Sequence, residues 1–326
     1  MILDGHNDLL LRLWRGEEPR HIDLARAREV GFGGGFFAVF VPGGRPPDPG
    51  HVPYALPLPD PVDRAAARET ALELAAVLER LEAEGVLRIA RRVDDFAEGQ
   101  VTAILHLEGA DPLAPDLSDL DEWHSRGLRS VGLVWSRPNA FAEGVPFAHP
   151  ASPDTGPGLT GPGRALVRAC NERGILVDCS HLNRRGFFDV VALSDAPIVA
   201  THSNAHALSP STRNLDDEQL DTIRASGGVV GVNFAVTFLR EDGRNETDTP
   251  LEQICRHFDY LAERMGPEHV AFGTHFEGAD VPAAIRGIED LPRVVDALRD
   301  RGWDEAALGK VTHENWLRVL RATWKD

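Results

Sequence analysis

The amino-terminal segment Asp4-Gly5-His6-Asn7-Asp8 carries the first side chains that could perform chemistry. It follows a short apolar run, which predicts that it lies at the end of a β-strand. Side chains at alternate positions of a strand share one face, so Asp4, His6 and Asp8 are expected to point the same way. A His-x-Asp pair offers one nitrogen and one oxygen donor, a combination that suits a divalent metal ion.

Five further polar side chains occur at the ends of later apolar runs. Each run is short and is followed by a polar or glycine-containing segment. Parallel strands of one barrel end at the same face, so these side chains are expected to meet the amino-terminal pair. They are Glu108, His181, His202, Asn233 and His275.

The order of apolar patterns predicts the fold that would bring these residues together. Strand-like runs alternate with helix-like segments along the whole chain, which is typical of a parallel α/β architecture. Eight such runs predict a (β/α)8 TIM barrel formed as one domain of residues 1–326, because α/β barrels of this length occur undivided. The runs cover residues 1–3, 36–41, 101–105, 130–134, 175–178, 197–200, 229–234 and 270–273.

Four other segments have patterns that predict local structure. Ala, Leu and Glu at helical spacing predict a long amphipathic helix over 63–85, and a helix-like pattern covers 22–30. The glycine cluster 31–35 predicts a flexible turn and not a phosphate loop, because it precedes its strand instead of joining a strand to a helix. The Gly- and Pro-rich segment 138–162 is too long for a simple connector, which predicts a lid or binding loop.

A metal centre explains the polar residues at the strand ends better than a set of structural histidines does. A single such histidine is most often a hydrogen-bonded structural residue. Four imidazoles and two carboxylates at one barrel mouth, however, would be costly to desolvate without a cation. Nitrogen and oxygen donors suit zinc, and a carboxylate that can bridge indicates two metal ions. Cys179 lies near His181 in sequence, but strand alternation places it deeper, in the barrel core.

Composition restricts the partners and the compartment of the protein. The net charge of −17 argues against binding to nucleic acid or to an anionic membrane surface. No run approaches the roughly 18 apolar residues of a membrane-spanning helix, and no signal segment precedes the first strand. Three cysteines without a Cys-x-x-Cys pair suit a reducing compartment. These features predict a cytoplasmic protein with a small-molecule substrate.

Seven motifs in the chain occur in the order of a known family. They are Asp4-Gly5-His6-Asn7-Asp8, His106-Leu107-Glu108-Gly109, Val177-Asp178-Cys179-Ser180-His181, Thr201-His202-Ser203-Asn204-Ala205, Arg213-Asn214-Leu215, the segment Gly227 to Phe234 and Glu314-Asn315-Trp316-Leu317-Arg318-Val319. Together they resemble the renal (membrane) dipeptidase family of zinc peptidases, within the amidohydrolase superfamily. The resemblance extends through nearly the whole chain.

The resemblance implies a role for each metal-binding candidate. One metal ion would be held by His6 and Asp8, and a second by His181 and His202. Glu108 would bridge the two ions. A hydroxide that bridges the metals would then attack the scissile carbonyl of the substrate.

The resemblance also implies how a dipeptide would be held. Arg213 matches the arginine that binds the substrate carboxylate, a task that suits a planar guanidinium. Asn233 would lie at the barrel mouth beside the substrate. Family members are often dimers, so a homodimer is expected.

Two positions depart from the family pattern. The family usually ends its eighth strand with Gly-Ser-Asp-Phe-Asp-Gly, whose first Asp transfers the proton, whereas residues 273–278 read Gly-Thr-His-Phe-Glu-Gly. His275 therefore stands at the catalytic position, and an imidazole with a pKa near ~6.5 can also carry a proton. Many members have a substrate-contacting histidine at the end of the fourth strand, where Trp135 would supply an apolar wall.

Three interpretations follow from the presence of His275. The first is a binuclear-metal hydrolase that cleaves dipeptides or similar small amides with a free carboxylate, with His275 as the proton carrier. The second is an amidohydrolase that acts on a cyclic amide, a lactone or a specialised metabolite. The third is a metal-binding protein with little peptidase activity, because the imidazole can itself bind metal and the lost carboxylate weakens cation binding. We take the first as the working hypothesis.

Overall fold

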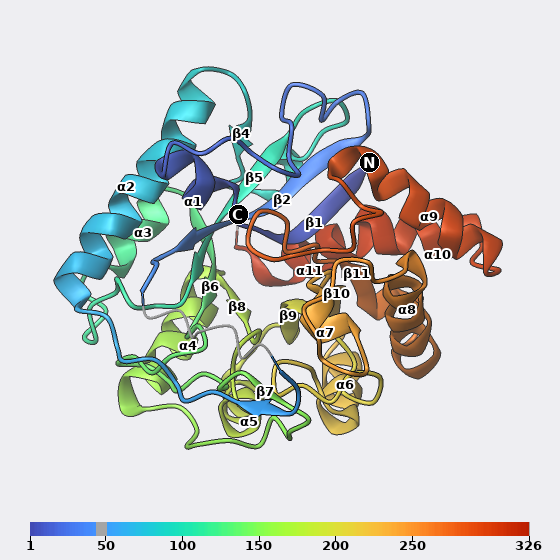
Figure 1. The fold of residues 1–326 in the computed structure, drawn as a ribbon. Helices are drawn as coiled ribbons and strands as arrows, with labels where there is room; N and C mark the ends of the chain where they lie inside the picture. Colours follow the sequence, from blue (N-terminus) through green and yellow to red (C-terminus); the bar gives the residue numbers. More distant parts are fainter. Residues whose placement is uncertain (44–50, 326) are drawn as a thin grey trace.

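Eight parallel strands close into a barrel in the computed structural model, which describes residues 1–43 and 51–325 (Figure 1). In order around the barrel they are β1 (Ile2–Asn7), β2 (Phe32–Phe40), β5 (Thr102–Glu108), β6 (Leu128–Gly132), β8 (Leu176–Asp178), β9 (Val199–Ser203), β10 (Val229–Val232) and β11 (Val270–Phe272). β1 pairs with both β2 and β11, and β2 pairs with β5, so the ring is complete. The predicted (β/α)8 TIM barrel is confirmed.

Most helices surround the barrel on its outside, and the last one covers one of its ends (Figure 1). They are α1 (Leu9–Trp14), α2 (Arg64–Ala83), α3 (Leu120–Ser125), α4 (Gly161–Arg173), α5 (Arg184–Leu193), α6 (Asp217–Ala225), α7 (Val236–Leu239), α8 (Leu251–Met265), α9 (Leu291–Asp300), α10 (Glu305–Gly309) and α11 (Asn315–Thr323). The described residues also form the short strands β3 (Tyr54–Ala55), β4 (Arg88–Ile89) and β7 (Ala148–His149), and the single turns η1 (Val93–Asp95), η2 (Pro267–His269), η3 (Ile288–Asp290) and η4 (Lys310–Glu314).

The long helix that the sequence predicts over 63–85 is α2. Its start is fixed by Asp63, whose side chain accepts a hydrogen bond from the Ala66 amide at 3.0 Å. Apolar residues at helical spacing are buried against the barrel. Within the part of the chain that the structure describes, no helix is both long enough and apolar enough to cross a membrane.

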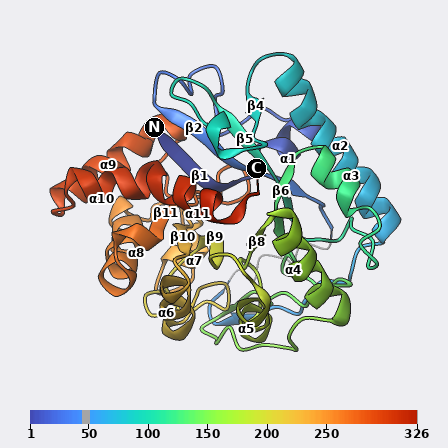
Figure 2. The ribbon, with the colours of Figure 1, turned by 180° about the vertical axis from the view of Figure 1, so that it is seen from behind.

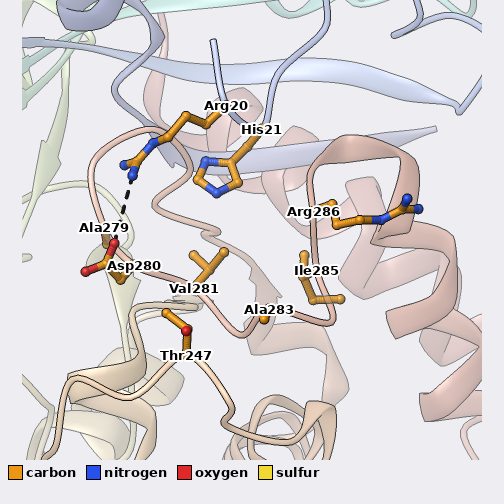
Figure 3. A pocket seen from close by; sticks show the side chains of 9 residues that line it. All are labelled: Arg20, His21, Thr247, Ala279, Asp280, Val281, Ala283, Ile285 and Arg286. Atoms are coloured by element: carbon orange, nitrogen blue, oxygen red, sulfur yellow. Dashed lines mark ion pairs between the residues drawn. The ribbon is translucent and has the colours of Figure 1, made fainter.

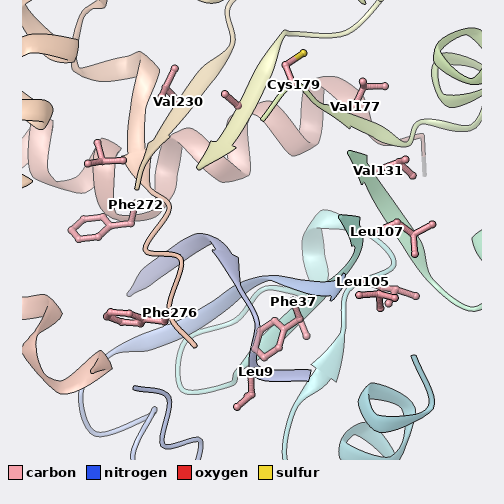
Figure 4. Packing of buried hydrophobic residues seen from close by; sticks show 14 of the residues in the cluster. Leu9, Phe37, Leu105, Leu107, Val131, Val177, Cys179, Val230, Phe272 and Phe276 are labelled. Carbon is pink, nitrogen blue, oxygen red and sulfur yellow. The ribbon is translucent and has the colours of Figure 1, made fainter. Parts of the chain in front are cut away.

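Two apolar clusters stabilise the barrel. The larger one joins the outer faces of the strands to the helices, and Figure 4 shows part of it. The smaller one fills the end of the barrel at which the strands begin. There Leu3, Ile104 and Leu176 pack with Trp316 of α11. In Figure 2, α11 lies in front of the strands and covers this end. The opposite end, where the strands terminate, is therefore the end left for polar side chains.

Cys179 corrects one expectation. It belongs to the larger cluster with Val177, between barrel and helices, and not to the barrel interior. The reason is that His181 has a φ of 65°, so the chain turns after β8 and strand alternation no longer relates residues 179 and 181.

Two other local predictions were wrong. The predicted helix over 22–30 is absent: residues 24–30 form consecutive turns, and the Asp23 side chain accepts a hydrogen bond from the Ala25 amide. The glycine cluster lies mostly within β2. Gly34 and Gly35 have φ values of 100° and 140°, and a Cβ atom on either would lie about 2 Å from a backbone oxygen of a neighbouring strand. These glycines permit close strand packing and do not form a flexible turn.

Segment 138–162 is attached to the loops that follow β8 and β9. The Val145 amide donates to the carbonyl of His181 at 2.9 Å. The Ala151 amide donates to the Pro210 carbonyl at 2.8 Å, and the Thr212 amide to the Ala148 carbonyl at 3.2 Å. Its strand β7 pairs with β3. The segment is thus fixed to the loop that carries Arg213.

Candidate metal centre

The end of β1 contributes two side chains to the centre of the barrel mouth. His6 is fully buried, and its Nε2 lies 3.3 Å from Asp8 Oδ2 and 3.7 Å from Glu108 Oε1. Asp4 is also fully buried but has a different use. Its two carboxylate oxygens accept the amide and the hydroxyl of Thr274 at 2.7 and 3.0 Å, which joins β1 to the chain after β11.

Glu108, at the end of β5, lies between three imidazoles. Its Oε1 is 3.1 Å from Nε2 of His181, 3.5 Å from Nε2 of His202 and 3.7 Å from Nε2 of His6. Despite these distances, Oε1 has no hydrogen-bond partner of acceptable geometry within residues 1–43 and 51–325. The Nε2 atoms of His181 and His202 are themselves 3.2 Å apart. Lone pairs that converge in this way are expected around a cation.

The second ring nitrogens of two of these histidines are held by hydroxyl groups. His181 Nδ1 lies 2.9 Å from Ser136 Oγ, and His202 Nδ1 lies 2.9 Å from Thr201 Oγ1. Metal-binding histidines generally have such a partner, which fixes the ring and directs the other nitrogen inward. Both rings therefore have the orientation that a metal ligand requires.

Burial and mutual charge shift the pKa values of the whole cluster. Burial, together with the nearby positive charge of Arg213, holds the pKa of His181 and of His202 well below the usual range, so both imidazoles are neutral donors. Burial raises the pKa of Glu108 to about 7. Burial also opposes the charged form of His6, but the carboxylates of Glu108 and Asp8 outweigh it and raise that pKa to about 9.

The donor atoms fit divalent metal ions. Three overlapping groups have donor atoms within 4.8 Å of one another, and the groups share residues. All donors are imidazole nitrogens or carboxylate oxygens, which suits zinc and similar ions. The groups are His6–Asp8–Glu108, Glu108–His181–His202 and His6–His202–His275.

His275 lies at the edge of this cluster, on the segment that follows β11. Its φ of 59° is in the left-handed region, and its amide donates to the His6 carbonyl at 3.0 Å. The ring packs edge-on against His6 and His202, with centroids 5.0 and 4.8 Å away, and its Nε2 lies 3.8 Å from Asp8 Oδ2. The Asn233 amide contacts the other ring nitrogen, Nδ1.

Arg213 is buried beside the cluster. Its Nη1 donates to Ser203 Oγ at 3.1 Å and its Nη2 to the His202 carbonyl at 3.0 Å, while Nε has no hydrogen-bond partner among the described residues. Burial lowers the pKa of Arg213 to about 10, and Glu108 partly offsets this effect, so the guanidinium is charged at neutral pH.

Aromatic rings connect the Arg213 region to the metal cluster. Trp135 is half-buried, with its ring centroid 5.8 Å from that of His181 and 5.6 Å from that of Phe147. Phe147 stacks on Phe238 at 6.1 Å, and the Arg213 guanidinium lies 5.8 Å above Phe238. The three aromatic residues Trp135, Phe147 and Phe238 are called the aromatic wall below.

A cavity of about 340 Å³ lies apart from the metal cluster and is lined in part by residues between Ala279 and Arg286 (Figure 3). Arg20, His21 and Asp280 are among its lining residues, and Arg20 faces Asp280 at 3.9 Å. The residues of the metal cluster do not line this cavity.

The sequence and the fold are similar to those of known proteins. The family model for membrane dipeptidase (peptidase family M19) matches residues 1–325. The chain belongs to the membrane dipeptidase family. It is similar to a metallo peptidase from Rhodobacter sphaeroides, crystallised with a phosphinate mimic of the dipeptide L-Ala-D-Ala, with 46% identity, a TM-score of 0.94 and 99% coverage of each chain.

Two other proteins are also similar to this chain. The metallo peptidase named dipeptidase AC is 47% identical with a TM-score of 0.93, and the match covers 99% of this chain and 98% of that chain. A Klebsiella pneumoniae protein from the pqqA 5′ region is 45% identical over 257 residues, which are 77% of this chain and 95% of that protein.

Sequence reasoning did not assign several residues that surround this dipeptidase-family centre. His106 lies beneath it, with Nδ1 2.9 Å from Ser130 Oγ, and burial lowers its pKa to about 4. Its position two residues before Glu108 on one strand was an available signal. Ser136 and Thr201, which hold His181 and His202, had weaker signals, because hydroxyl residues near a strand end are common.

Proposed function

We propose that the protein is a metal-dependent dipeptidase with two divalent ions, zinc in the first instance. His6 and Asp8 would hold one ion, His181 and His202 the other, and Glu108 both. The observation that carries this proposal is the position of Glu108 Oε1, which faces three imidazole Nε2 atoms within 3.7 Å and has no hydrogen-bond partner among the described residues. Membership of the family supports the metal dependence.

Bound metal ions would supply the Lewis acid that polarises the scissile carbonyl and lowers the pKa of the attacking water. The chain itself supplies the groups that orient the substrate. Arg213 would bind the substrate carboxylate, since no carboxylate among the described residues is hydrogen-bonded to its buried positive charge. The dipeptide mimic bound to the Rhodobacter sphaeroides relative supports a substrate of this class.

His275 would carry the proton. Its Nε2 is on the side of Asp8 and the imidazole cluster, where a water and a scissile amide would meet. The ring would take a proton from the attacking water at Nε2 and deliver it to the leaving amine. This is the role that the family gives to an aspartate.

The aromatic wall would contact the apolar part of the substrate. Trp135 lies beside His181, and Phe238 lies beside Arg213, so the wall extends from the proposed metal ligands to the proposed carboxylate site. Segment 138–162, which carries Phe147, would cover the bound dipeptide. Asn233, whose amide contacts His275 Nδ1, would lie beside the substrate at the barrel mouth.

The test is an assay of zinc-loaded protein against a library of L-Xaa-L-Xaa and L-Xaa-D-Xaa dipeptides. We expect turnover of several members, with a preference for apolar side chains that could contact the aromatic wall. Loss of activity after chelation and recovery after zinc addition would attribute the turnover to metal. If no dipeptide is cleaved by the metal-loaded protein, the proposal is wrong.

His275 itself favours one rival function, a metal-binding protein with little peptidase activity. The donor group His6–His202–His275 would allow the imidazole to bind metal instead of carrying a proton. This rival predicts that His275→Asp creates or greatly raises dipeptidase activity. An unmodified protein that is fast and becomes slower on His275→Asp would exclude it. A library extended to cyclic amides and lactones tests the other rival, an amidohydrolase of different specificity.

The cysteines of the protein bear on its cellular location. We propose a cytoplasmic location, supported by three cysteines that are free and buried, namely Cys170, Cys179 and Cys255. The homodimer that the family resemblance implies stays a prediction. Light scattering of the purified protein would test it directly.

A further inference from the structure

Arg137 is a fully buried arginine that follows Trp135 by two residues, after the end of β6. A guanidinium keeps its positive charge in proteins, so its burial requires partners for both the charge and the donors. Asp111, in the loop after β5, supplies the opposite charge. Its Oδ1 accepts a hydrogen bond from Arg137 Nε at 3.1 Å.

The other donors of Arg137 reach the segment after β2. Nη2 donates to the Val41 carbonyl at 2.9 Å, and Nη1 donates to the Gly43 carbonyl at 3.3 Å. Because β2 pairs with β5 and β5 with β6, this one side chain connects the ends of three adjacent strands. A planar guanidinium can donate in several fixed directions at once, whereas the compact ammonium of a lysine cannot reproduce this set.

The Arg137 guanidinium also packs against two aromatic rings. Its central carbon lies 5.6 Å from the ring centroid of Trp135 and 5.6 Å from that of Phe40. The two rings contact each other, with centroids 5.2 Å apart. A cation over an aromatic ring is attracted by the ring quadrupole, and more strongly where water is excluded. The indole of Trp135 is therefore held by Phe40 and by a charge that hydrogen bonds fix in place.

The backbone of Trp135 is held as well. Its carbonyl accepts the Arg137 amide at 2.7 Å, which closes a tight turn. The same carbonyl packs against Gly144 of segment 138–162, where a Cβ atom would lie 1.9 Å from the oxygen. Since the indole lies 5.8 Å from the ring of His181, a shift of Trp135 would change the space beside a proposed metal ligand.

We propose that Arg137 is a positioning residue that fixes the Trp135 indole and thereby sets the selectivity of the site for dipeptides with an apolar side chain. The inference rests on the proposed function, in which the aromatic wall contacts the substrate. A half-buried indole without such support would sample several rotamers, and the space beside His181 would have no fixed shape. With Arg137 in place, this space is formed before the substrate arrives, so less binding free energy is lost in ordering it.

Trp135 needs this support more than a polar residue at the same position would. A histidine, which many family members have there, can be oriented by a hydrogen bond to the substrate. Apolar contact between an indole and a substrate side chain is non-directional and does not orient the ring. The orientation must therefore come from the protein, and the contacts of Arg137 supply it.

Replacement of both members of the ion pair tests the proposal. Arg137→Met combined with Asp111→Asn removes the guanidinium without leaving a buried carboxylate unpaired. We expect KM for dipeptides with large apolar side chains, such as Leu-Leu, to rise about 10-fold with kcat and metal content nearly unchanged, because the lost contact is with the bound side chain. KM for Gly-Gly should change much less. Arg137→Lys, which keeps the charge near Asp111, should fold more readily and show a smaller change of the same kind.

The same double substitution in a Trp135→Ala background separates positioning from general structural support. Without the indole, Arg137 has nothing to position. We therefore expect no further loss of selectivity between Leu-Leu and Gly-Gly, although Tm should still fall. An equal loss of selectivity in both backgrounds would overturn the inference.

Arg91→Met combined with Glu82→Gln is the matched control. Arg91 has the same kinds of partners, since Nη1 and Nη2 donate to the two Glu82 carboxylate oxygens at 2.9 Å and Nη1 donates to the Ile89 carbonyl at 3.1 Å. Ile89 pairs with β5 near the start of that strand, far from the barrel mouth. We expect a lower Tm for this variant with selectivity unchanged.

Fluorine NMR of 5-fluorotryptophan-labelled protein observes the indole without any substrate. The chain has six tryptophans, and Trp135→Phe identifies the signal of Trp135. We expect this signal to shift or broaden when Arg137 and Asp111 are replaced and to stay unchanged in the control. If no dipeptide is cleaved but the signal changes in this way, the proposed function fails and the positioning of Trp135 stands. If dipeptides are cleaved but the signal or the selectivity is unaffected, the positioning inference fails alone.

Discussion

Glu108 and Glu277 have the same local sequence and opposite surroundings. Each is the third residue of a His-x-Glu-Gly segment near the carboxyl end of a barrel strand, and each is 4% exposed. The first segment forms the end of β5, and the second follows β11. Glu277 accepts the backbone amides of Arg20, His21 and Ile22 at 2.7 to 2.9 Å. Arg12 lies 3.3 Å away and balances its charge. Glu108 has Oε1 directed at imidazole nitrogens and no hydrogen-bond partner for it in the described chain.

The difference is one of hydrogen-bond satisfaction, and not of burial or residue type, between a structural carboxylate and the proposed metal ligand. Burial of an unpaired carboxylate costs free energy, so such a group persists where a cation or function offsets the cost. The backbone produces the reversal. In the first segment the strand continues through Glu108, whereas His275 and Glu277 have φ values of 59° and 70°, which direct the histidine inward and the glutamate outward.

The largest expected effect is that of Glu108→Gln on activity. The variant loses the shared ligand, and we expect kcat/KM for dipeptides to fall by more than the roughly 100-fold that loss of an outer partner costs. Metal analysis should show fewer bound ions. Glu277→Gln is the matched control, and its metal content should equal that of the unmodified protein. Equal metal content in both variants would contradict the distinction between the two glutamates.

The second effect is the response of stability to metal. Zinc at 100 times its Kd should stabilise the unmodified protein by about 2.7 kcal/mol, because it binds only the folded state. Differential scanning calorimetry with zinc and with chelator measures this shift. We expect Glu277→Gln to respond as the unmodified protein does and Glu108→Gln to respond much less. A full response from Glu108→Gln would remove Glu108 from the ligand set.

The third effect is on stability without metal. Glu277→Gln leaves one of its bonded backbone amides facing an amide group instead of a carboxylate oxygen, and we expect a loss of about 1–3 kcal/mol in the free energy of unfolding. Glu108→Gln should instead stabilise the metal-free protein, because burial disfavours the charged form of Glu108 and its Oε1 has no hydrogen-bond partner among the described residues. Urea unfolding of the metal-free variants decides between these signs. Destabilisation by Glu108→Gln of similar size would contradict the comparison.

The smallest effect is the dependence of metal-free stability on pH. Burial raises the pKa of Glu108 from 4.5 to about 7 in the folded protein, so the folded state binds more protons than the unfolded state between these values. Its contribution to stability is present below pH 4.5 and is lost as the pH rises through 7. Unfolding curves from pH 4.5 to 7.5 should therefore fall less steeply for Glu108→Gln than for Glu277→Gln. Parallel curves would contradict this expectation.

Strand periodicity was sufficient to predict that most of these polar side chains meet at the barrel mouth. His6, Asp8 and Glu108 lie on or directly after regular strands, and their common destination follows from the barrel. The barrel itself could be predicted because its eight apolar runs are separated by helical patterns. The family resemblance added Arg213, which lies outside any strand and has no periodic signal.

Contacts that depend on left-handed backbone or on distant partners could not be predicted in this way. Cys179 was misplaced because His181 departs from strand geometry. The glycines of β2 were interpreted as a turn, since their close contact with neighbouring strands is visible only when those strands are in place. The partner of His275 is 42 residues away, and those of Glu277 are more than 250 residues away.

The pairing of β1 with β11 determines when during synthesis the site can form. Asp4 lies opposite Phe272, and the His275 amide is bonded to the His6 carbonyl, so the earliest and latest parts of the centre are direct neighbours. A ribosome that adds about 5–20 residues per second needs on the order of tens of seconds to make the chain between them. During this interval β1 has no β11 to pair with, and the barrel is open at this seam. The barrel mouth that holds His6 and Asp8 is therefore completed only after the last barrel strand has been translated.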